Sequence, residues 1–320
     1  MKTYLGIDGG GTKTKLILCD GDGRVLAEDV QPTSNYLQVG VGGVTRVLAA
    51  GLDAICKEAG VDAAGIAGAF VGLPGFGDSE AEIPRLQAAV DAAMAGIPCR
   101  VGNDCENSLA GTLGGRSGIS LICGTGSIAC GRNDAGETLR CGGWHHLLGS
   151  DEGSGYWISV QLLHAFTRQS DGRDARTPLY RAIREALALQ VDGDVITRVV
   201  EEWGMDRTRV AALSRLAGDL VRQGDPATVE ILRRAAGELA DMAATLYRRL
   251  GFTGVMPVSY SGGVFSLGAP LLDPLRALLA KHSMALESPL LPPDRGALVL
   301  AFQGAGEAVP EGLLHPVSSE

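Results

Sequence analysis

The chain has 320 residues, of which 45% are hydrophobic and 20% charged, and its net charge is −9. This length favours two domains, the acidic charge argues against nucleic-acid binding, and no apolar run reaches the roughly 18 residues that a membrane-spanning helix needs. The seven scattered cysteines form no Cys-x-x-Cys pattern and the start lacks a secretion signal, so we expect a cytoplasmic protein without a disulfide framework or zinc site.

The first part of the sequence predicts an α/β domain. In chain order, the expected elements are strands at 3–7, 14–19 and 24–29, a helix at 41–60, a strand at 66–72, a helix at 79–95, a strand at 98–102 and a helix at 104–114. Strands that are separated by helices of this length pair in parallel and carry the helices on the faces of the sheet.

The rest of the chain repeats the hairpins and adds a long helical stretch. The expected elements are strands near 117–123, 127–132 and 138–141, helices through most of 151–250, a strand at 255–260, a helix at 270–282, a strand at 284–287 and a helix at 294–307. We predict an N-terminal domain at 1–113 and a C-terminal domain at 114–320, whose last helix could return to the first domain. The tail at 310–320 is expected to fray.

Two of the predicted hairpins break into glycines and then resume as strands. The first contains residues 9–11, directly after Asp8, and the second contains residues 124–126. Because glycine lacks a side chain, the backbone N–H groups of such turns can approach a phosphate closely. One glycine turn could be an ordinary hairpin, but two in the same local order predict a duplicated domain whose hairpins hold the phosphates of ATP from both sides.

The first glycine turn is followed by polar side chains. Thr12 could add a hydroxyl and Lys13 a cation to a phosphate site. Asp8 stands at the end of a strand, where it could hold a magnesium-bound water. The alternative is a tight hairpin with a solvated Lys13, and this motif alone favours neither interpretation.

An acidic residue follows the strand at 98–102. Asn103 and Glu106 have the spacing of a capping box, so Asn103 is expected to cap the next helix. Asp104 is then not needed as the cap and could accept a proton from a substrate hydroxyl. Considered alone, Asp104 fits better as an acid that merely suits the helix dipole.

A loop before the long helical stretch gathers glycines, Trp144 and Asp151. An aromatic face beside hydrogen-bonding groups suits a sugar. The alternative is that Asp151 caps the following helix and Trp144 fills the core. The pair His145 and His146 could suggest a metal, but adjacent histidines without further ligands nearby are more often ordinary loop residues.

Two shorter motifs are weak on their own. Asn35 could bond sugar hydroxyls or simply turn the chain before a helix, and the second interpretation is the better one without context. Gly262 and Gly263 end a late strand and could let an adenosine lie against the backbone.

Taken together, these motifs resemble the N-acetylglucosamine kinase branch of the actin, hexokinase and Hsp70 ATPase superfamily, which overlaps the BadF/BadG/BcrA/BcrD ATPase family. They look most like the motifs of bacterial kinases that salvage amino sugars from cell-wall murein. The matching motifs are Asp8-Gly-Gly-Gly-Thr12, Asn35, Asn103-Asp104, Gly124-Thr-Gly126-Ser127, Gly142-Gly143-Trp144, Asp151-Glu-Gly-Ser154 and Ser261-Gly-Gly263. The resemblance implies an α/β fold of two duplicated ribonuclease-H-like (actin-like ATPase) domains around a cleft for ATP and sugar.

The resemblance also implies a reaction: a homodimer would transfer a phosphoryl group from ATP, with Mg²⁺, to a hydroxyl of N-acetylglucosamine, N-acetylmuramic acid or both. Asp104 would be the general base, and Asp8 would hold Mg²⁺ through water. The sugar would be contacted by Asn35, Asp104, Ser127, Gly143, Trp144 and Asp151. The nucleotide would be held by Gly9, Gly10, Gly11, Thr12, Lys13, Gly124, Thr125, Gly126, Gly262 and Gly263.

The sugar loop departs from the family pattern at one point. His145 stands where the family usually has glycine, and the loop that leads to Asp151 is one residue longer. The shape of the sugar pocket, and therefore the exact sugar and hydroxyl, stay open. Glucosamine is the nearest alternative substrate, since only a pocket that hydrogen-bonds an acetamide would reject it strongly.

Two other protein classes are alternatives. An iron–sulfur activator ATPase of an acyl-CoA reductase or dehydratase shares the ATP fold, but it usually carries Gly-Gly-Gln-Asp where this chain has Gly262-Gly-Val-Phe265. A sugar-sensing repressor places DNA-binding helices ahead of the fold, and a glycine turn that starts by residue 8 would leave no room for them.

Overall fold

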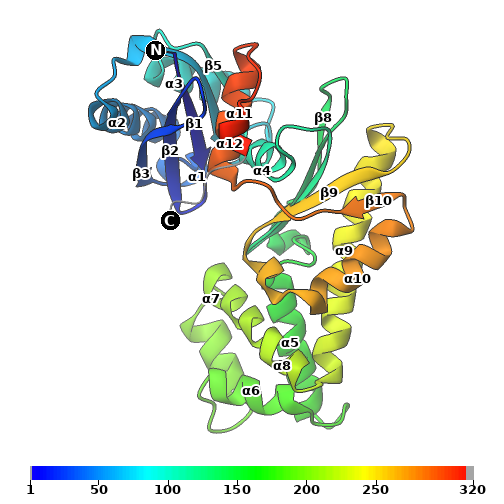
Figure 1. Ribbon diagram of the computed structural model, residues 1–320. Coiled ribbons are helices and arrows are strands. Elements are labelled where there is room, and N and C mark those ends of the chain that lie inside the picture. The colour runs from blue at the N-terminus through cyan, green and yellow to red at the C-terminus, as the bar shows by residue number, and fades with distance from the viewer. Residues whose placement is uncertain (1, 315–320) are drawn as a thin grey trace. The chain divides into compact units, whose positions relative to one another are not determined.

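The two glycine turns lie in different structural units (Figure 1). The computed structural model describes residues 2–314. Unit 1 contains the residues up to 117 together with those from 288 onward, and unit 2 contains residues 118–287. The predicted C-terminal domain at 114–320 left open a return of its last helix to the first domain, and in the structure the segment that carries α11 (Pro293–Gly304) does belong to unit 1. Within the described range, no helix has both the length and the apolar character that crossing a membrane requires.

Unit 1 is built on a five-stranded sheet with the order β3-β2-β1-β4-β5. Its strands are β1 (Thr3–Gly9), β2 (Lys13–Asp20), β3 (Val25–Pro32), β4 (Ile66–Leu73) and β5 (Cys99–Asn103). The first three strands are antiparallel neighbours, and β4 and β5 extend the sheet in parallel from β1. Seven of the eight residues of β4 are buried, as expected for a parallel strand that is covered on both faces.

Helices cover both faces of this sheet. They are α1 (Tyr36–Val39), α2 (Val41–Ala59), α3 (Ile83–Ala93), α4 (Asp104–Leu113), α11 (Pro293–Gly304) and α12 (Glu311–Leu314), with a short 3-10 turn at Ala63–Gly65. Alternate residues of β1 point to opposite faces: Leu5 and Ile7 join the core under α2 and α3, whereas the ring of Tyr4 stacks on Phe302 of α11, with the centroids 3.9 Å apart.

The closing segment is held tightly in unit 1. A side chain at Gly6 would come within 2.7 Å of the backbone of α11, so glycine permits the close approach of that helix to β1. The prediction that the tail frays is wrong for residues 311–314, because they form α12 and Leu313 is fully buried. The rest of that tail, 315–320, lies outside the described residues.

Unit 2 repeats the strand arrangement of unit 1. Its sheet has the order β10-β9-β6-β7-β8, with β6 (Gly118–Cys123), β7 (Ser127–Arg132), β8 (Thr138–Gly142), β9 (Met256–Ser261) and β10 (Met284–Leu286). Here too, three antiparallel strands are followed by two strands that extend the sheet in parallel. The repeated order confirms the predicted duplication of an α/β domain.

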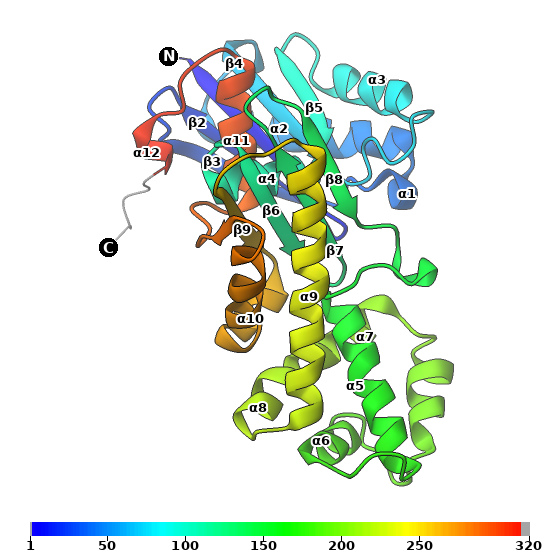
Figure 2. The same ribbon diagram turned by 90° about the vertical axis from the view of Figure 1, so that its right-hand side faces the viewer.

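The long insertion between β8 and β9 is helical, as predicted. It contains α5 (Gly155–Ser170), α6 (Pro178–Ala186), α7 (Arg207–Ala212), α8 (Leu216–Arg222) and α9 (Pro226–Arg249), with a π-helix at Ile196–Glu202 and short 3-10 turns at His146–Leu148 and Leu213–Arg215. After β9 come a 3-10 turn, Gly263–Leu267, and α10 (Ala269–Ala280). Helix α9 packs against both α5 and α10 (Figure 2).

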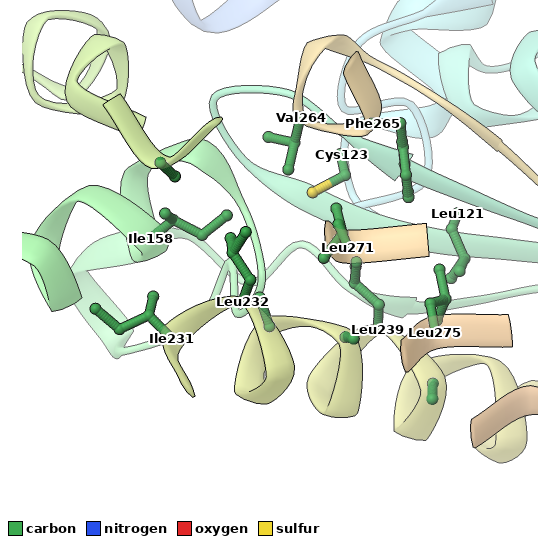
Figure 3. Packing of buried hydrophobic residues seen from close by; sticks show 14 of the residues in the cluster. Leu121, Cys123, Ile158, Ile231, Leu232, Leu239, Val264, Phe265, Leu271 and Leu275 are labelled. Carbon is green, nitrogen blue, oxygen red and sulfur yellow. The ribbon is translucent and has the colours of Figure 1, made fainter. Parts of the chain in front are cut away.

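One continuous core joins the sheet of unit 2 to these helices (Figure 3). Leu121 and Cys123 of β6 face Leu239 of α9 and Leu271 of α10, and all four side chains are fully buried. Burial of apolar surface on this scale is the main source of stability in such a unit. It gives the end of β6, where the second glycine turn begins, a rigid base.

Candidate active site

The carboxyl ends of the parallel strands of unit 1 bring three sequence motifs to one edge of the sheet. Asp8 of β1 pairs with Gly72 of β4, and Gly72 pairs with Gly102 of β5. The glycine turn, Asn103 and Asp104 therefore all follow directly from neighbouring strand ends. This is the edge at which open α/β sheets bind ligands.

The first glycine turn is closed by its own backbone and held by two side chains. The N–H of Gly10 donates to the carbonyl of Lys13 at 2.9 Å. Thr33 and Gln38 donate to the carbonyl oxygens of Gly10 and Gly11 at 2.7 and 2.9 Å. Within residues 2–314, nothing accepts from the N–H groups of Gly11 and Thr12, and both residues are exposed. The turn can therefore offer these donors to an anion.

Asp8 is held by Asn107, a residue that no sequence motif singled out. The side-chain amide of Asn107 donates to Asp8 Oδ1 at 2.7 Å and to the carbonyl of Ile7 at 3.2 Å. Desolvation raises the pKa of Asp8 to about 7; the Asn107 hydrogen bond opposes that rise, and the charge of Asp104 adds to it. No donor in the described part of the chain reaches Asp8 Oδ2. This half-buried carboxyl with one unused oxygen fits a role as one of the few carboxylate ligands that Mg²⁺ takes.

Asp104 lies in the first turn of α4, as predicted. The side-chain oxygen of Asn103 accepts the N–H of Cys105 at 3.1 Å, and Glu106 Oε1 accepts the N–H of Asn103 at 3.1 Å. Asn103 is therefore the cap and forms the predicted capping box with Glu106. Asp104 is half-buried, and its charge acts on Asp8.

The second glycine turn, in unit 2, is joined to the start of a helix. The N–H of Gly124 donates to the carbonyl of Gly126 at 2.9 Å, which closes the turn. The carbonyl oxygens of Gly124 and Thr125 accept the N–H groups of Gly155 and Tyr156 in α5, at 2.9 and 3.2 Å. The positive end of the α5 dipole therefore lies directly beside the turn, which favours a bound anion.

A pocket of about 520 Å³ opens beside this turn. Its walls come from four segments of unit 2, namely the glycine turn, the start of α5, the α7 region and the turn after β9. The lining residues are Gly124, Thr125, Gly155, Thr208, Ala211, Ala212, Ser214, Arg215, Gly263, Val264 and Ser266. The volume is typical of pockets for small-molecule ligands and cofactors. We call this the unit 2 pocket.

Of the five predicted nucleotide residues of unit 2, three line the unit 2 pocket, whereas Gly126 and Gly262 do not. The three are Gly124, Thr125 and Gly263, and a Cβ at Gly124 or Gly263 would meet nothing within 4 Å. Gly262 has a structural reason to be glycine, since it stands at φ 102 and a Cβ there would overlap the backbone of Cys123.

Asp151 is not the cap of the following helix, which was one of the two roles that the sequence left open for it. Ser154 caps α5 by accepting the N–H of Trp157 at 3.1 Å. Asp151 is buried, with a relative exposure of 2%. Its Oδ1 accepts the N–H of Ser127 at 3.2 Å, and its Oδ2 lies 2.5 Å from Arg207 Nη2. The structure therefore brings Ser127 and Asp151 together directly after the second glycine turn.

The loop before Asp151 is exposed and has an unusual backbone. Trp144 is 74% exposed, so the alternative that it fills the core is wrong. Gly143 stands at φ 75 and His145 at φ 86, a region that glycine enters easily. His145 therefore occupies a backbone position that suits the glycine usual in the family. His145 Nδ1 accepts the N–H of Leu147 at 3.3 Å and so starts a short turn.

Asn35 has a local structural role in unit 1. Its Oδ1 accepts the N–H of Leu37 at 3.0 Å and caps α1, and its own N–H donates to Thr33 Oγ1 at 3.0 Å. Thr33 also holds the first glycine turn. Asn35 therefore has the predicted turn-forming role. It reaches the glycine turn only indirectly, through Thr33.

Three features of these regions were not predicted. Asn107 lies three residues after Asp104 on the same helix, and that spacing, which places two side chains on one helix face, was a usable signal. Arg207 and the α7 wall of the unit 2 pocket carried no signal, because they lie far along the chain from the motifs they meet.

Comparison with known proteins agrees with this arrangement. The BadF/BadG/BcrA/BcrD ATPase family matches residues 5–298. The N-acetyl-D-glucosamine kinase of Dictyostelium discoideum is 30% identical over 93% of this chain and 97% of that protein. The N-acetylmuramic acid/N-acetylglucosamine kinase of Clostridium acetobutylicum is 33% identical over 75% of this chain and 77% of that protein.

A solved structure shares the whole architecture. The crystal structure of a Chromobacterium violaceum protein, provisionally named an N-acetylglucosamine kinase, matches with a TM-score of 0.72 and 26% identity over 94% of this chain and 99% of that one. The two-domain actin-like ATPase fold is therefore confirmed. Since the family match spans most of the sequence, this chain belongs to the BadF/BadG/BcrA/BcrD ATPase family.

Proposed function

We infer that the chain is an ATP-dependent kinase that phosphorylates a hydroxyl of an N-acetylated amino sugar, either N-acetylglucosamine, N-acetylmuramic acid or both. The relatives from Dictyostelium discoideum and Clostridium acetobutylicum, at 30% and 33% identity, are named as kinases of these sugars. Membership of an ATPase family supports the use of ATP.

One observation in unit 2 carries this inference. The second glycine turn lines the unit 2 pocket through Gly124 and Thr125, and its next residues meet Asp151, since Ser127 donates to that carboxylate. A nucleotide in the pocket and a sugar on Asp151 would therefore lie on either side of one short turn. That arrangement suits transfer between two bound molecules, where positioning supplies much of the rate.

Unit 1 would supply the proton acceptor and the metal ligand. Asp104 would take the proton of the sugar hydroxyl as the new bond to phosphorus forms. Asp8, oriented by Asn107, would hold Mg²⁺ directly or through water. A bound Mg²⁺ would neutralise phosphate charge. The free N–H groups of Gly11 and Thr12, with Lys13 nearby, would donate to phosphate oxygens.

The first test measures ADP release by the purified protein with MgATP and a panel of N-acetylglucosamine, N-acetylmuramic acid, glucosamine, glucose and no sugar. We expect one or both N-acetylated sugars to stimulate release strongly. A preference for glucosamine would reject the acetamide requirement while keeping the kinase. A rate that no sugar changes would overturn the proposal, and iron in anaerobically purified protein would then favour the iron–sulfur activator.

We also propose that the protein is a cytoplasmic homodimer. The resemblance to the amino-sugar kinases supports the dimer, and the seven cysteines, of which five are buried, suit a reducing compartment. Light scattering at micromolar concentration tests the dimer, and a mass near the 33.1 kDa of one chain would contradict it.

A further inference from the structure

Asp151 forms an ion pair with an arginine that lies 56 positions later in the chain. Arg207, the first residue of α7, places Nη2 at 2.5 Å from Asp151 Oδ2, and the other carboxylate oxygen accepts the N–H of Ser127. Asp151 stands at φ 67, which few residues other than glycine adopt. These contacts fix the carboxylate that the sugar site is proposed to use.

Glycine at position 126 is required by this pair. A Cβ there would overlap Arg207 Nη2 and would come within 2.8 Å of Asp151 Oδ1. The guanidinium therefore occupies the space directly beside the second glycine turn. Arg207 belongs to the proposed sugar region, although no sequence motif connects it to that region.

Arg207 has hydrogen-bonding capacity that the protein does not use. Its Nε is buried and finds no acceptor among residues 2–314, and Asp151 engages Nη2. A buried N–H without an acceptor costs stability. The side chain is 37% exposed, and a guanidinium donates in a planar fork that matches a carboxylate. While one N–H of Nη2 holds Asp151, Nη1 and the second N–H of Nη2 are left to donate to a ligand carboxylate.

The charge of Arg207 matters differently for neutral and for anionic sugars. Asp151 alone would repel a substrate carboxylate beside it, whereas the ion pair cancels that charge. A neutral sugar needs only the acceptor oxygens of Asp151. N-acetylmuramic acid carries a lactyl carboxylate that N-acetylglucosamine lacks, so it would depend more strongly on the arginine.

We propose that Arg207 determines whether the sugar site accepts an acidic N-acetylated amino sugar, because it neutralises Asp151 and donates to the sugar carboxylate. This inference rests on the proposed kinase function and deepens it. Arg207 is a specificity residue, and it has little influence on the choice among neutral amino sugars.

The test compares kcat/KM for N-acetylmuramic acid, its neutral methyl ester and N-acetylglucosamine in the wild type, Arg207→Met, Arg207→Lys and Arg209→Met. Arg209 is exposed on the same helix and is the matched control. For Arg207→Met, kcat/KM for N-acetylmuramic acid should fall about 10- to 100-fold relative to kcat/KM for N-acetylglucosamine. The value for the methyl ester should change by the same factor as that for N-acetylglucosamine. Arg207→Lys keeps the charge without the planar fork, so the same kcat/KM ratio should fall less in this variant. It replaces Arg207→Met in the test if Arg207→Met does not fold.

Several outcomes would overturn the proposal. An equal loss of kcat/KM for all three sugars would make Arg207 only a positioning residue for Asp151. A fall in kcat alone, equal for every sugar, would place its charge on the transferred phosphoryl group. A wild type that uses N-acetylglucosamine but not the acid would reject the proposal while the kinase function stands. Transfer to no sugar would remove the kinase function, and the proposal with it.

Discussion

The two glycine turns close in a similar way but differ in what holds them. In unit 1, the carbonyl oxygens of the turn accept from the side chains of Thr33 and Gln38. In unit 2, they accept from the backbone of Gly155 and Tyr156 at the start of α5. The second turn therefore gains the positive end of a helix dipole, which the first turn lacks. A duplicated hairpin has thus acquired two different electrostatic environments.

The adjoining strand ends differ as well. In unit 1 they carry Asp8 and Asp104, close enough that the charge of one raises the pKa of the other. In unit 2 the strand ends open on a pocket whose lining contains no acidic residue and one arginine, Arg215. Unit 1 therefore presents two carboxylates that suit the proposed base and metal ligand, and unit 2 presents a pocket without acidic lining that suits the proposed nucleotide.

The largest expected effect tests the chemical role of unit 1. Asp104→Asn should lower kcat about 10²- to 10⁴-fold, because the amide cannot accept the proton of the sugar hydroxyl. The affinity for ATP should change little, since the substitution leaves the unit 2 pocket intact. Steady-state kinetics with calorimetric titration of ATP measure both. Turnover within a few-fold of the wild type would remove Asp104 as the base.

A matched pair of substitutions compares the two turns directly. At Gly11 and Gly124 a Cβ would meet nothing within 4 Å and φ is not positive, so alanine should leave the fold intact. Each methyl should crowd a bound phosphate. We expect the Kd for ATP to rise about tenfold for Gly124→Ala, which is ~1.4 kcal/mol, and less for Gly11→Ala, because only the second turn has the helix dipole.

The controls for this pair are Gly65→Ala in unit 1 and Gly193→Ala in unit 2. A Cβ at either position also meets open space, and neither residue lies in a glycine turn. Both controls should bind ATP like the wild type. A larger loss at Gly11 than at Gly124 would show that the dipole of α5 does not decide which turn binds phosphate more strongly.

A smaller effect concerns the stability of unit 1 against pH. The pKa of Asp8 is raised from 3.8 to about 7 by desolvation, so the folded chain binds this proton more tightly than the unfolded chain. The protonated Asp8 carboxyl therefore contributes stability to the folded state that is fully present below about pH 4 and is lost as the pH rises to about 7. Asp8→Asn removes the ionisation. In EDTA, we expect the Tm of the variant to exceed that of the wild type by about 2–6 °C at pH 8, and by less at pH 5.

Thermal unfolding at the two pH values, with the exposed Asp53→Asn as control, measures this difference. Adding Mg²⁺ and ATP should stabilise the wild type and not Asp8→Asn, because a ligand that binds only the folded state raises Tm. A Tm difference that is the same at pH 5 and pH 8 would mean that Asp8 stays ionised in the folded protein.

Much of the fold could be predicted from the sequence because local signals were strong. In unit 1, Gly60 ends α2 in the left-handed conformation, and Val44, Leu48 and Ile55 form the buried stripe of that helix. The capping box at Asn103 set the start of α4. Where a glycine, a cap or a helical period marks an element, its ends fall within a few residues of the prediction.

The parts that could not be predicted depend on contacts between distant residues. Arg207 meets Asp151 across 56 positions, and nothing near Arg207 in the sequence marks it as different from the other arginines. The sequence left open whether the last helix returns to the first domain, and its contact with β1 depends on Gly6, whose missing side chain gives room to a helix almost 300 residues later. Such contacts are fixed by the packing of the whole unit, which no local pattern contains.

The smallest expected effect lies in the loop of unit 2 that departs from the family. His145 stands at φ 86, where a residue with a Cβ is strained and glycine is not. His145→Gly relieves that strain but loses the hydrogen bond from Leu147, so we expect a net gain of about 0.5 kcal/mol, or a rise in Tm of ~1–2 °C. Gly143→Ala is the opposite case, because φ is 75 and its Cβ would lie 3.0 Å from Ile128 Cδ1.

Comparing the two variants separates backbone strain from side-chain contacts. Gly143→Ala should lower Tm by more than His145→Gly raises it, since it adds strain and crowding together. If His145→Gly instead lowers Tm, the ring of His145, whose centroid lies 4.4 Å from that of His146, stabilises the loop more than its backbone strains it. The departure from glycine would then be a source of loop order, and KM for the sugar should rise in the same variant.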